Sequence, residues 1–289
     1  MVTLSVIVPV YREGAGLQVL LAAFGAQTLD ADRFEVILVD NDPDGPAPLP
    51  PLPALPFAAQ VVDCRIPGSY AARNAGAAHA SGKIFAFTDS DCLPTMGWLC
   101  ALVAASIEMQ DEILVGPVDL YAAPVPNVWE IFDTVRGMRQ DIFVRHGYGV
   151  TANLAVRATL FRHLGGFDDA RLSGGDAEFC RRAGRQGVRL RLVTSAKVRH
   201  PARKSREEIE TKARRIKGGQ ISIGPIWQRA LWGVRSLCPP AREMGMYLLE
   251  KEFPLRWRFI ACHIRMLLWR VELHELYRLS VLRKPPERR

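Results

Sequence analysis

Two near-continuous apolar runs, residues 4–10 and 34–39, lie near the start of the chain and are rich in β-branched residues. The segment between them, residues 15–27, has a helical pattern. Strands that crossover helices bury on both faces have this appearance, so the runs predict neighbouring strands of a parallel sheet. The alternation continues through residues 58–63, 69–80 and 84–88, expected as strand, helix and strand. The pattern predicts an α/β fold with a mostly parallel sheet.

The later part of the chain is more helical. The expected elements are a helix at 94–109, strands at 113–118 and 190–198, and helices at 204–218 and 253–283. We expect an α/β domain over residues 1–201 and a basic amphipathic helical region over residues 202–289.

The net charge of +8 is unevenly distributed. Residues 1–180 contain 11 Lys and Arg against 21 Asp and Glu, whereas residues 181–289 contain 27 against 9. The basic part is expected to meet an anionic surface, which leaves nucleic acid, anionic lipid and the acidic domain itself open. The last predicted helix carries Trp257 and Trp269 among arginines, which suits the headgroup layer of an anionic bilayer. Alternatively, its apolar residues pack on the α/β domain and its arginines form a solvated face.

The six cysteines show no C-x-x-C pair and no regular spacing, so neither a zinc module nor a disulfide framework is predicted. The first residues lack the basic segment of a signal peptide. No apolar run approaches about 18 residues, because arginines interrupt the most hydrophobic C-terminal stretch. We therefore expect a cytoplasmic protein that does not span a membrane.

Asp89 and Asp91 directly follow the apolar run at residues 84–87. Carboxylates at i and i+2 where a strand ends can reach one hard cation, which keeps room for substrate phosphate oxygens. The D-x-D pattern therefore favours a metal–diphosphate site, although a solvated turn has the same pattern.

Two further side chains lie at expected ligand-facing positions. Asp40 ends the second strand, and ligands of open parallel sheets bind at the carboxyl ends of strands. It could accept hydrogen bonds from a pyrimidine or a ribose, or simply begin a turn before Pro43. Arg73 lies on the helix after the third strand, where it could pair with phosphate, hold Asp89 in place, or form an ordinary surface arginine.

Asp176 follows paired glycines and stands where a helical pattern begins. A carboxylate at a helix N-terminus is favoured in its ionised form, which suits a general base, although a simple N-cap has the same pattern. His200 closes the predicted strand at 190–198 and could enter a metal site or serve the structure alone.

In this order the motifs resemble the family 2 glycosyltransferases, which are inverting nucleotide-sugar enzymes with the GT-A fold. The matching segments are residues 5–13, Asp40, and residues 72–76, 89–91, 151–154, 165–168 and 175–178, followed by His200. The resemblance covers residues 4 to about 201, and the ordered set is far more specific than any one motif.

The resemblance implies a Rossmann-like GT-A sheet flanked by helices, with a nucleotide-sugar half at about 1–118 and an acceptor half at about 119–201. The residues it implies for donor binding are Pro9, Tyr11, Glu13, Asp40, Arg73, Asn74, Asp89, Ser90 and Asn153. It implies Mg²⁺ or Mn²⁺ as cofactor, with Asp91 as the main ligand and Asp89 and His200 as further ligands. Asp176 would deprotonate an acceptor hydroxyl as it attacks the anomeric carbon, with inversion.

The sequence departs from the family pattern in two places. The glutamate that usually precedes the base aspartate is here Gly175, which removes that pairing. The usual Asp-Asp-Gly-Ser after the second strand is here residues 40–43, Asp-Asn-Asp-Pro, which leaves nucleotide choice less defined. The Gln-x-x-Arg-Trp motif of processive synthases is missing from the sequence, which favours single sugar additions.

The expected reaction is transfer of one sugar from a nucleotide-diphosphate sugar, with a UDP-sugar favoured, to a carbohydrate or lipid-linked acceptor. An anionic membrane surface is a further expected partner, at the inner face of the cytoplasmic membrane. A dinucleotide-dependent oxidoreductase is the competing enzyme class, because Gly14 and Gly16 follow a strand, but Val19 replaces the third glycine of that fingerprint. Nucleic-acid binding by the basic region has no zinc-finger or RNP-type motif in its favour, so no nucleic acid is expected.

Overall fold

The structure is a computed structural model that describes residues 2–12, 15–42, 44, 45, 49, 52–107, 112–171 and 173–286. The chain forms two compact units. Unit 1 comprises Met1–Asp119, Met138–Ala170 and Gly175–His200. Unit 2 comprises Leu120–Gly137, Arg171–Gly174 and Pro201–Arg289.

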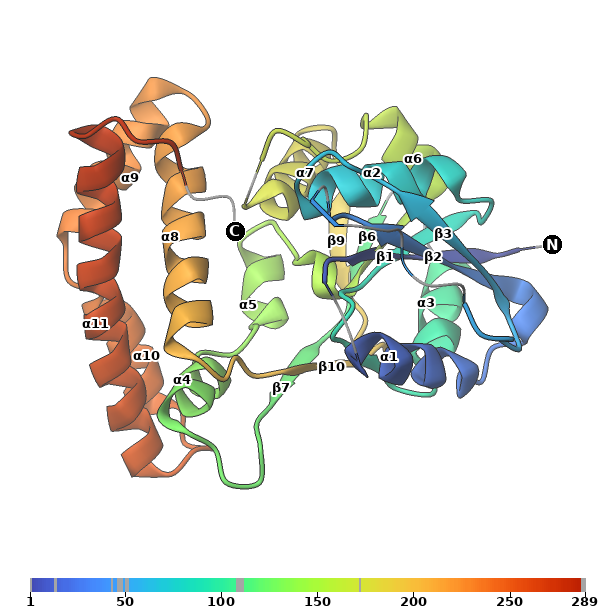
Figure 1. Ribbon diagram of the computed structural model, residues 1–289, viewed down its shortest axis with the longest axis horizontal. Coiled ribbons are helices and arrows are strands. Elements are labelled where there is room, and N and C mark those ends of the chain that lie inside the picture. The colour runs from blue at the N-terminus through green and yellow to red at the C-terminus, as the bar shows by residue number, and fades with distance from the viewer. Residues whose placement is uncertain are drawn as a thin grey trace. The chain divides into compact units, whose positions relative to one another are not determined.

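Unit 1 is built on a seven-stranded sheet (Figure 1). The order of its strands is β3-β2-β1-β4-β8-β6-β9. Its strands are β1 (Leu4–Val10), β2 (Phe34–Asp40), β3 (Ala58–Asp63), β4 (Ile84–Phe87), β6 (Glu112–Val115), β8 (Leu154–Arg157) and β9 (Arg189–Leu192). The first four strands are parallel, β8 runs antiparallel to β4 and β6, and β6 is parallel to β9. The carboxyl ends of β1, β2 and β4 therefore meet at one edge, as the sequence predicts.

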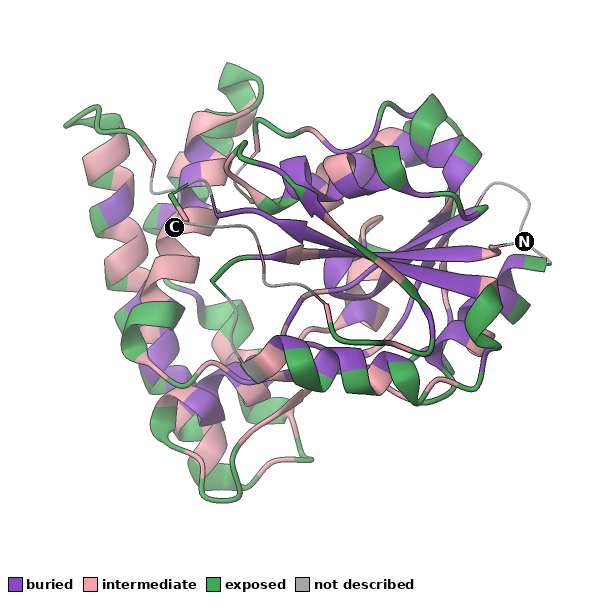
Figure 2. Ribbon diagram, turned by 45° about the vertical axis from the view of Figure 1, so that its right-hand side comes forward, coloured by how far each residue is buried: buried purple, intermediate pink, exposed green. Residues whose placement is uncertain are grey.

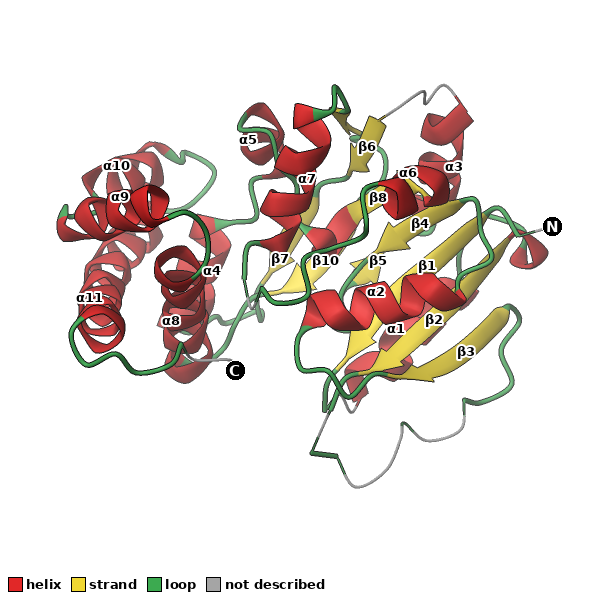
Figure 3. Cartoon of the chain, turned by 90° about the horizontal axis from the view of Figure 1, so that it is seen from above, coloured by secondary structure: helices red, strands yellow, loops and turns green. Residues whose placement is uncertain are grey.

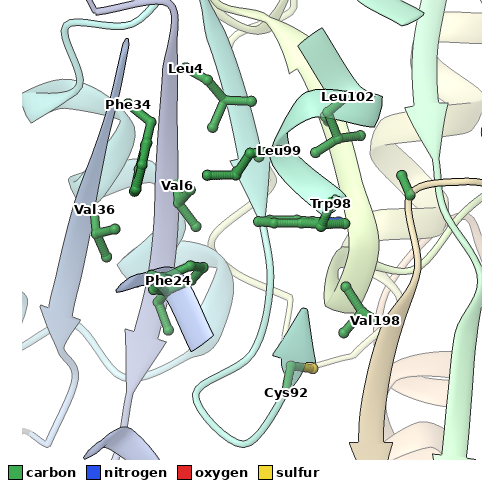
Figure 4. Close-up of a cluster of buried hydrophobic side chains, with 14 of the residues drawn as sticks. Leu4, Val6, Phe24, Phe34, Val36, Cys92, Trp98, Leu99, Leu102 and Val198 are labelled. Carbon is green, nitrogen blue, oxygen red and sulfur yellow. The ribbon is translucent and has the colours of Figure 1, made fainter. Parts of the chain in front are cut away.

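Helices cover both faces of this sheet (Figures 1 and 3). They are α1 (Ala15–Gly25), α2 (Ser69–His79), α3 (Trp98–Ile107), α5 (Gln140–Arg145), α6 (Ala158–His163) and α7 (Gly175–Arg185), with short 3-10 turns η1 (Ala31–Arg33) and η2 (Thr151–Asn153). Helices α1 and α3 bury Phe24 and Trp98 on one face, where their rings lie 6.4 Å apart (Figure 4). Helices α2, α6 and α7 cover the other face, where Tyr70, Phe161 and Phe179 are buried. The central strands β1, β2 and β4 are almost wholly buried (Figure 2), which explains their continuous apolar runs, whereas the edge strands β3 and β9 are mostly half-buried or exposed.

The predicted α/β fold is confirmed, and several boundaries differ. The helix expected at 94–109 is α3, which begins only at Trp98, because Leu93 and Pro94 lie in a short strand; the helix expected at 204–218 is α8, shifted to Arg206–Ser222. The expected strand at 190–198 is two strands, because β9 ends at Leu192 and β10 (Val198–Pro201) begins after a turn. The expected strand at 113–118 is likewise divided between β6 and β7 (Val118–Tyr121). Antiparallel β8 has no counterpart in the sequence-based expectation. Strands β7 and β10, together with β5 (Leu93–Pro94), form a second, three-stranded sheet in the order β5-β10-β7.

A buried carboxylate joins the amino ends of the central strands. Glu35 on β2 accepts hydrogen bonds from the Ser5 hydroxyl at 2.6 Å and from the Ser81 N–H at 2.7 Å. Burial alone raises the pKa of Glu35, but the hydrogen bonds from Ser5, Ser81 and the Gly82 N–H outweigh it and lower the pKa. The ionised carboxylate therefore ties β1, β2 and the turn before β4 together.

Unit 2 is helical. Its helices are α4 (Val128–Arg136), α8 (Arg206–Ser222), α9 (Ile226–Leu237), α10 (Ala241–Leu249) and α11 (Leu255–Ser280). Its core brings Phe132 of α4, Ile209 of α8 and Tyr247 of α10 against Ile264 and Leu268 of α11. Helix α4 lies in the segment Leu120–Gly137, far from the other helices of unit 2 in the sequence, which lie in Pro201–Arg289. Unit 2 is therefore assembled from distant segments of the chain.

The two tryptophans on the last predicted helix are half-buried and make contacts within unit 2. Trp257 stacks on Phe253 with ring centroids 6.0 Å apart, and Trp269 donates a hydrogen bond to the Ser236 carbonyl at 2.8 Å. Trp257 packs against the core of unit 2, which residues of α11 form together with the other helices of that unit. Across the part of the chain that the structure describes, no helix combines the length and apolarity needed to cross a bilayer.

Candidate active site

The D-x-D loop leaves the carboxyl end of β4 and folds back at once. The Thr88 hydroxyl donates to the Ala152 carbonyl at 3.0 Å, and the Cys92 N–H donates to the Asp89 carbonyl at 3.1 Å. Ser90, between the two acids, is buried. These hydrogen bonds fix a tight turn, so Asp89 and Asp91 project from one small loop.

His200 reaches this loop because β10 pairs antiparallel with β5, the strand that begins just after Cys92. The register places Arg199 opposite Leu93, so the next residue of β10 lies beside the D-x-D loop. The Nε2 of His200 lies 3.4 Å from Oδ1 of Asp91, and the imidazole is buried. The strand pairing thus joins segments more than a hundred residues apart, as the order of motifs predicts.

Four side chains at this point could hold a metal ion. Asp89, Asp91, Cys92 and His200 each offer an atom, and these atoms lie within 4.8 Å of one another. Burial, with the charges of Asp89 and Asp91 in support, raises the pKa of the Cys92 thiol well above its usual range. Besides that thiol, the set offers two carboxylates and an imidazole. That donor set fits a hard divalent cation, and the imidazole suits Mn²⁺ better than Mg²⁺.

Arg73 of α2 holds the first of these aspartates. Its side chain is 3% exposed, its Nη2 forms an ion pair with Oδ1 of Asp89, and its Nη1 donates to the Ser69 carbonyl at 3.3 Å. The sequence left three roles open for Arg73, and this ion pair corresponds to the role in which the arginine holds Asp89 in place. The guanidinium also lies 5.8 Å from the centre of the Tyr70 ring.

Asp176 lies at the start of α7 and receives a hydrogen bond from Tyr70, a residue that the sequence motifs do not single out. The Tyr70 hydroxyl donates to Oδ1 of Asp176 at 3.2 Å. Burial, with the charge of Asp176 in support, raises the pKa of Tyr70 far above its usual range, so this hydroxyl stays protonated and keeps donating. The only sequence signal is that Tyr70 and Arg73 occupy one face of the same predicted helix.

The glycine before Asp176 now has a physical reason. A Cβ at Gly175 would lie 2.7 Å from Cε2 of Tyr70, closer than real Cβ atoms approach a neighbour. The tyrosine ring therefore occupies the space in which a side chain at this position would begin. Where the family usually has a glutamate, this chain pairs a glycine with Tyr70.

The surroundings of Asp176 tune its proton affinity. Burial raises the pKa of this half-buried carboxyl, and the Ala177 N–H, Arg73, the Tyr70 hydroxyl and the Thr151 N–H partly offset that rise. A raised pKa makes the carboxylate a stronger base while the donors keep its ionised form accessible.

Two other predicted donor-binding positions lie at the expected strand ends. Asp40, buried at the end of β2, accepts hydrogen bonds from the N–H groups of Asp42 at 3.2 Å and Leu49 at 3.1 Å. Pro9 lies beside Val39 in the β1–β2 register, and its side chain is half-buried.

After β1 comes Tyr11, which is 36% exposed and lies 5.0 Å under the guanidinium of Arg12. Glu13, also predicted for the nucleotide pocket, lies outside the described residues.

Two predicted donor contacts are engaged elsewhere. Asn74 accepts from the Phe167 N–H at 2.9 Å and donates to its carbonyl at 2.8 Å, so it clamps the double-glycine loop. Asn153 is fully buried, accepts from the Trp98 indole at 2.9 Å and donates to the Ala196 and Pro117 carbonyls. With these atoms bonded to protein, the surroundings of both side chains favour positioning roles over contacts to a sugar nucleotide.

A family model described as glycosyl transferase family 2 matches residues 5–157. The chain belongs to this family. It is 31% identical to the glycosyltransferase AglE of Haloferax volcanii over 243 aligned residues, and this alignment covers 79% of this chain and 79% of AglE. It is 30% identical over 213 residues to the pre-mycofactocin glycosyltransferase of Mycobacterium tuberculosis, which covers 69% of this chain and 43% of that protein. The chain is therefore a glycosyltransferase, and the oxidoreductase alternative is excluded.

Solved structures of similar fold support the GT-A architecture. One is S. aureus TarS 1–349 in complex with UDP-GlcNAc, with a TM-score of 0.53 and 16% identity over 96% of this chain and 89% of that one. Another is the mannosyltransferase PcManGT from Pyrobaculum calidifontis in complex with GDP-Man and Mn²⁺, with a TM-score of 0.54 and 14% identity over 94% and 86%. At these identities the likeness concerns the fold alone.

Proposed function

We propose that this family 2 glycosyltransferase is metal-dependent and inverting, and that it transfers one sugar from a UDP-sugar to an acceptor hydroxyl. One observation carries the proposal. Arg73 contacts Asp89 of the candidate metal site and lies against the ring of Tyr70, whose hydroxyl binds Asp176. The candidate metal site and the candidate base are thus joined through side chains of a single helix, α2. Within the family sequence pattern, these are the positions that meet the diphosphate and the acceptor.

In this proposal Asp91, Asp89 and His200 hold the divalent cation. When bound, such a cation neutralises charge that develops on a departing nucleoside diphosphate. Arg73 keeps the Asp89 carboxylate in place, and the pairing of β5 with β10 keeps His200 beside Asp91.

Asp176 is the proposed general base. Its raised pKa suits it to take the proton from an acceptor hydroxyl as that oxygen attacks the anomeric carbon from the face opposite the leaving group. The Tyr70 hydroxyl and the Ala177 N–H both donate to Oδ1, and these hydrogen bonds hold the carboxylate in one orientation. Attack from the opposite face gives inversion.

The proposal also names a donor and an acceptor. Asp40 at the end of β2 supports a nucleotide there, and the two similar structures hold a UDP-sugar and a GDP-sugar. We favour UDP, with a carbohydrate or lipid-linked acceptor. We also assign catalysis to residues 1–201 and place the protein in the cytoplasm at an anionic membrane surface, consistent with the basic residues 202–289.

A thermal-shift panel tests the proposal. It uses UDP, GDP, dTDP, CDP and NAD, each with and without Mn²⁺. At a nucleotide concentration about 100 times its Kd, the stabilisation is about 2.7 kcal/mol, enough to raise Tm by several degrees. We expect a shift with UDP that requires Mn²⁺ and is lost in Asp91→Ala, but kept in Asp32→Ala, an exposed acid at the amino end of β2. An increase in Tm with NAD alone, or an increase with UDP that is the same with and without Mn²⁺, contradicts the proposal.

A further inference from the structure

Helix α9 has an apolar side and a polar side. It spans Ile226–Leu237 with the sequence IWQRALWGVRSL and contains two arginines and no acidic residue. At about 100° per residue, Ile226, Leu237, Val234, Trp227 and Leu231 fall within one arc of roughly 140°. No polar side chain of α9 falls inside that arc.

The apolar side of α9 faces outward. The five side chains of this arc are between 60% and 81% exposed. A helix of a globular protein normally turns its apolar stripe to the core, so this exposure is the reverse of the usual arrangement. Contiguous exposed apolar side chains of this kind mark an interaction surface.

The polar side holds α9 onto unit 2. Ser236 is buried, accepts a hydrogen bond from Lys217 of α8 at 2.8 Å, and offers its carbonyl to the Trp269 indole. Arg229 donates to the Ile221 carbonyl at 2.5 Å. These contacts fix the rotation of the helix, so its outward apolar arc is set by specific bonds.

Charge identifies the occupant of this surface. Arg229 and Arg235 stand on the two sides of the apolar arc, about 60° and 40° beyond its edges, and both residues are exposed. Two copies packed through this face in a two-fold arrangement would bring these arginines together without an acid on α9 to pair them. A bilayer with anionic headgroups instead accepts the apolar arc below and the arginines at its rim.

We propose that α9 lies in the interface of an anionic bilayer and is the element that attaches the protein to it. The inference deepens the membrane attachment proposed above by naming its element. It rests on no step of sugar transfer and is tested without donor or acceptor.

The test is co-sedimentation of the full chain with vesicles of equimolar phosphatidylcholine and phosphatidylglycerol at about 0.15 M salt. The double variant Trp227→Ser, Leu231→Ser should bind these vesicles on the order of 100-fold more weakly, because two inserted apolar side chains are lost. Arg235→Gln should weaken binding about fivefold. Vesicles of phosphatidylcholine alone should bind the wild type weakly.

The matched control is Leu255→Ser, Phe259→Ser, which removes two exposed apolar side chains of α11 from the same unit. It should bind vesicles like the wild type. If it loses binding while the α9 variant keeps it, the surface lies on α11 and the proposal is overturned. Because all four positions are exposed, thermal unfolding should be unchanged in both variants.

Two more measurements separate the remaining outcomes. Brominated lipid should quench tryptophan fluorescence of the wild type, and Trp227→Phe should still bind but lose most of that quenching. If the wild type does not bind anionic vesicles, lipid attachment is refuted. It is also refuted if the wild type is a dimer in solution and the α9 variant, but not the α11 control variant, is a monomer. Sugar-nucleotide binding measured in parallel shows whether the glycosyltransferase proposal stands on its own.

Discussion

Replacing Tyr70 by Phe removes one hydroxyl and leaves the ring that packs against Gly175. The hydroxyl donates to the ionised form of Asp176 at 3.2 Å. A hydrogen bond to a charged acceptor contributes about 1.5–3 kcal/mol, and this length places it at the lower end. Losing this donor raises the pKa of Asp176 further, because the hydrogen bond from Tyr70 is one of the interactions that lower the pKa against the effect of burial. The fraction of ionised base at acidic pH should fall roughly tenfold.

The assay is the pH dependence of kcat/KM for nucleoside diphosphate release from the sugar nucleotide. The acid limb in Tyr70→Phe should move to higher pH, with rates about tenfold lower on that limb and nearly unchanged on the plateau. Nucleotide affinity should not change. Tyr277→Phe, at an exposed tyrosine of α11, is the matched control and should behave like the wild type. An unmoved acid limb, or an equal loss at every pH, would show that Tyr70 does not act through the proton on Asp176.

Three further changes have defined outcomes. Asp176→Asn should abolish transfer and keep nucleotide affinity within about twofold in calorimetry, since the base acts on the acceptor; surviving transfer means the base is elsewhere. Gly175→Ala should lower the rate at least tenfold, because its Cβ would lie 2.7 Å from the Tyr70 ring and shift the Tyr70 hydroxyl away from Asp176. An unchanged pH–rate profile in this variant would contradict the link between Gly175, Tyr70 and the proton on Asp176. Glu35→Gln should lower the free energy of unfolding by about 1–2 kcal/mol at pH 7. Since folding lowers the pKa of Glu35, that difference should shrink as the pH falls below about 4, and a pH-independent difference would refute the reasoning.

The parallel strands were predictable because burial on both faces leaves a local signature. Strands β1 and β3 have the expected bounds, and α2 and α11 lie within one to three residues of theirs. Strand β8 was not predicted, because three apolar residues followed by Arg157 are too short a segment to show a period that separates a strand from a loop. Unit 2 was placed only in part, since α4 joins it from residues 128–136, and such long-range assembly has no sequence pattern.

The acids and the histidine of the candidate site were predictable from the order of their motifs along the chain. The residues that contact and position these side chains were not. Tyr70 meets Asp176 across 106 positions of sequence, and only the fold brings them together. Asn153 was expected at the donor because of its motif, yet its bonds to Trp98 and the Ala196 carbonyl are formed by burial that a motif does not reveal. The apolar arc of α9 was missed for a related reason, because sequence periodicity shows that a helix is amphipathic and not which side is covered.

The most direct test of the central claim is an anomalous difference map from crystals grown with Mn²⁺ and the nucleotide that the panel selects. We expect one manganese peak at the carboxyl end of β4, within coordinating distance of a carboxylate oxygen of Asp91 and beside Nε2 of His200, with the diphosphate against it. A bound nucleotide with manganese elsewhere, or with no manganese at Asp91, would contradict it.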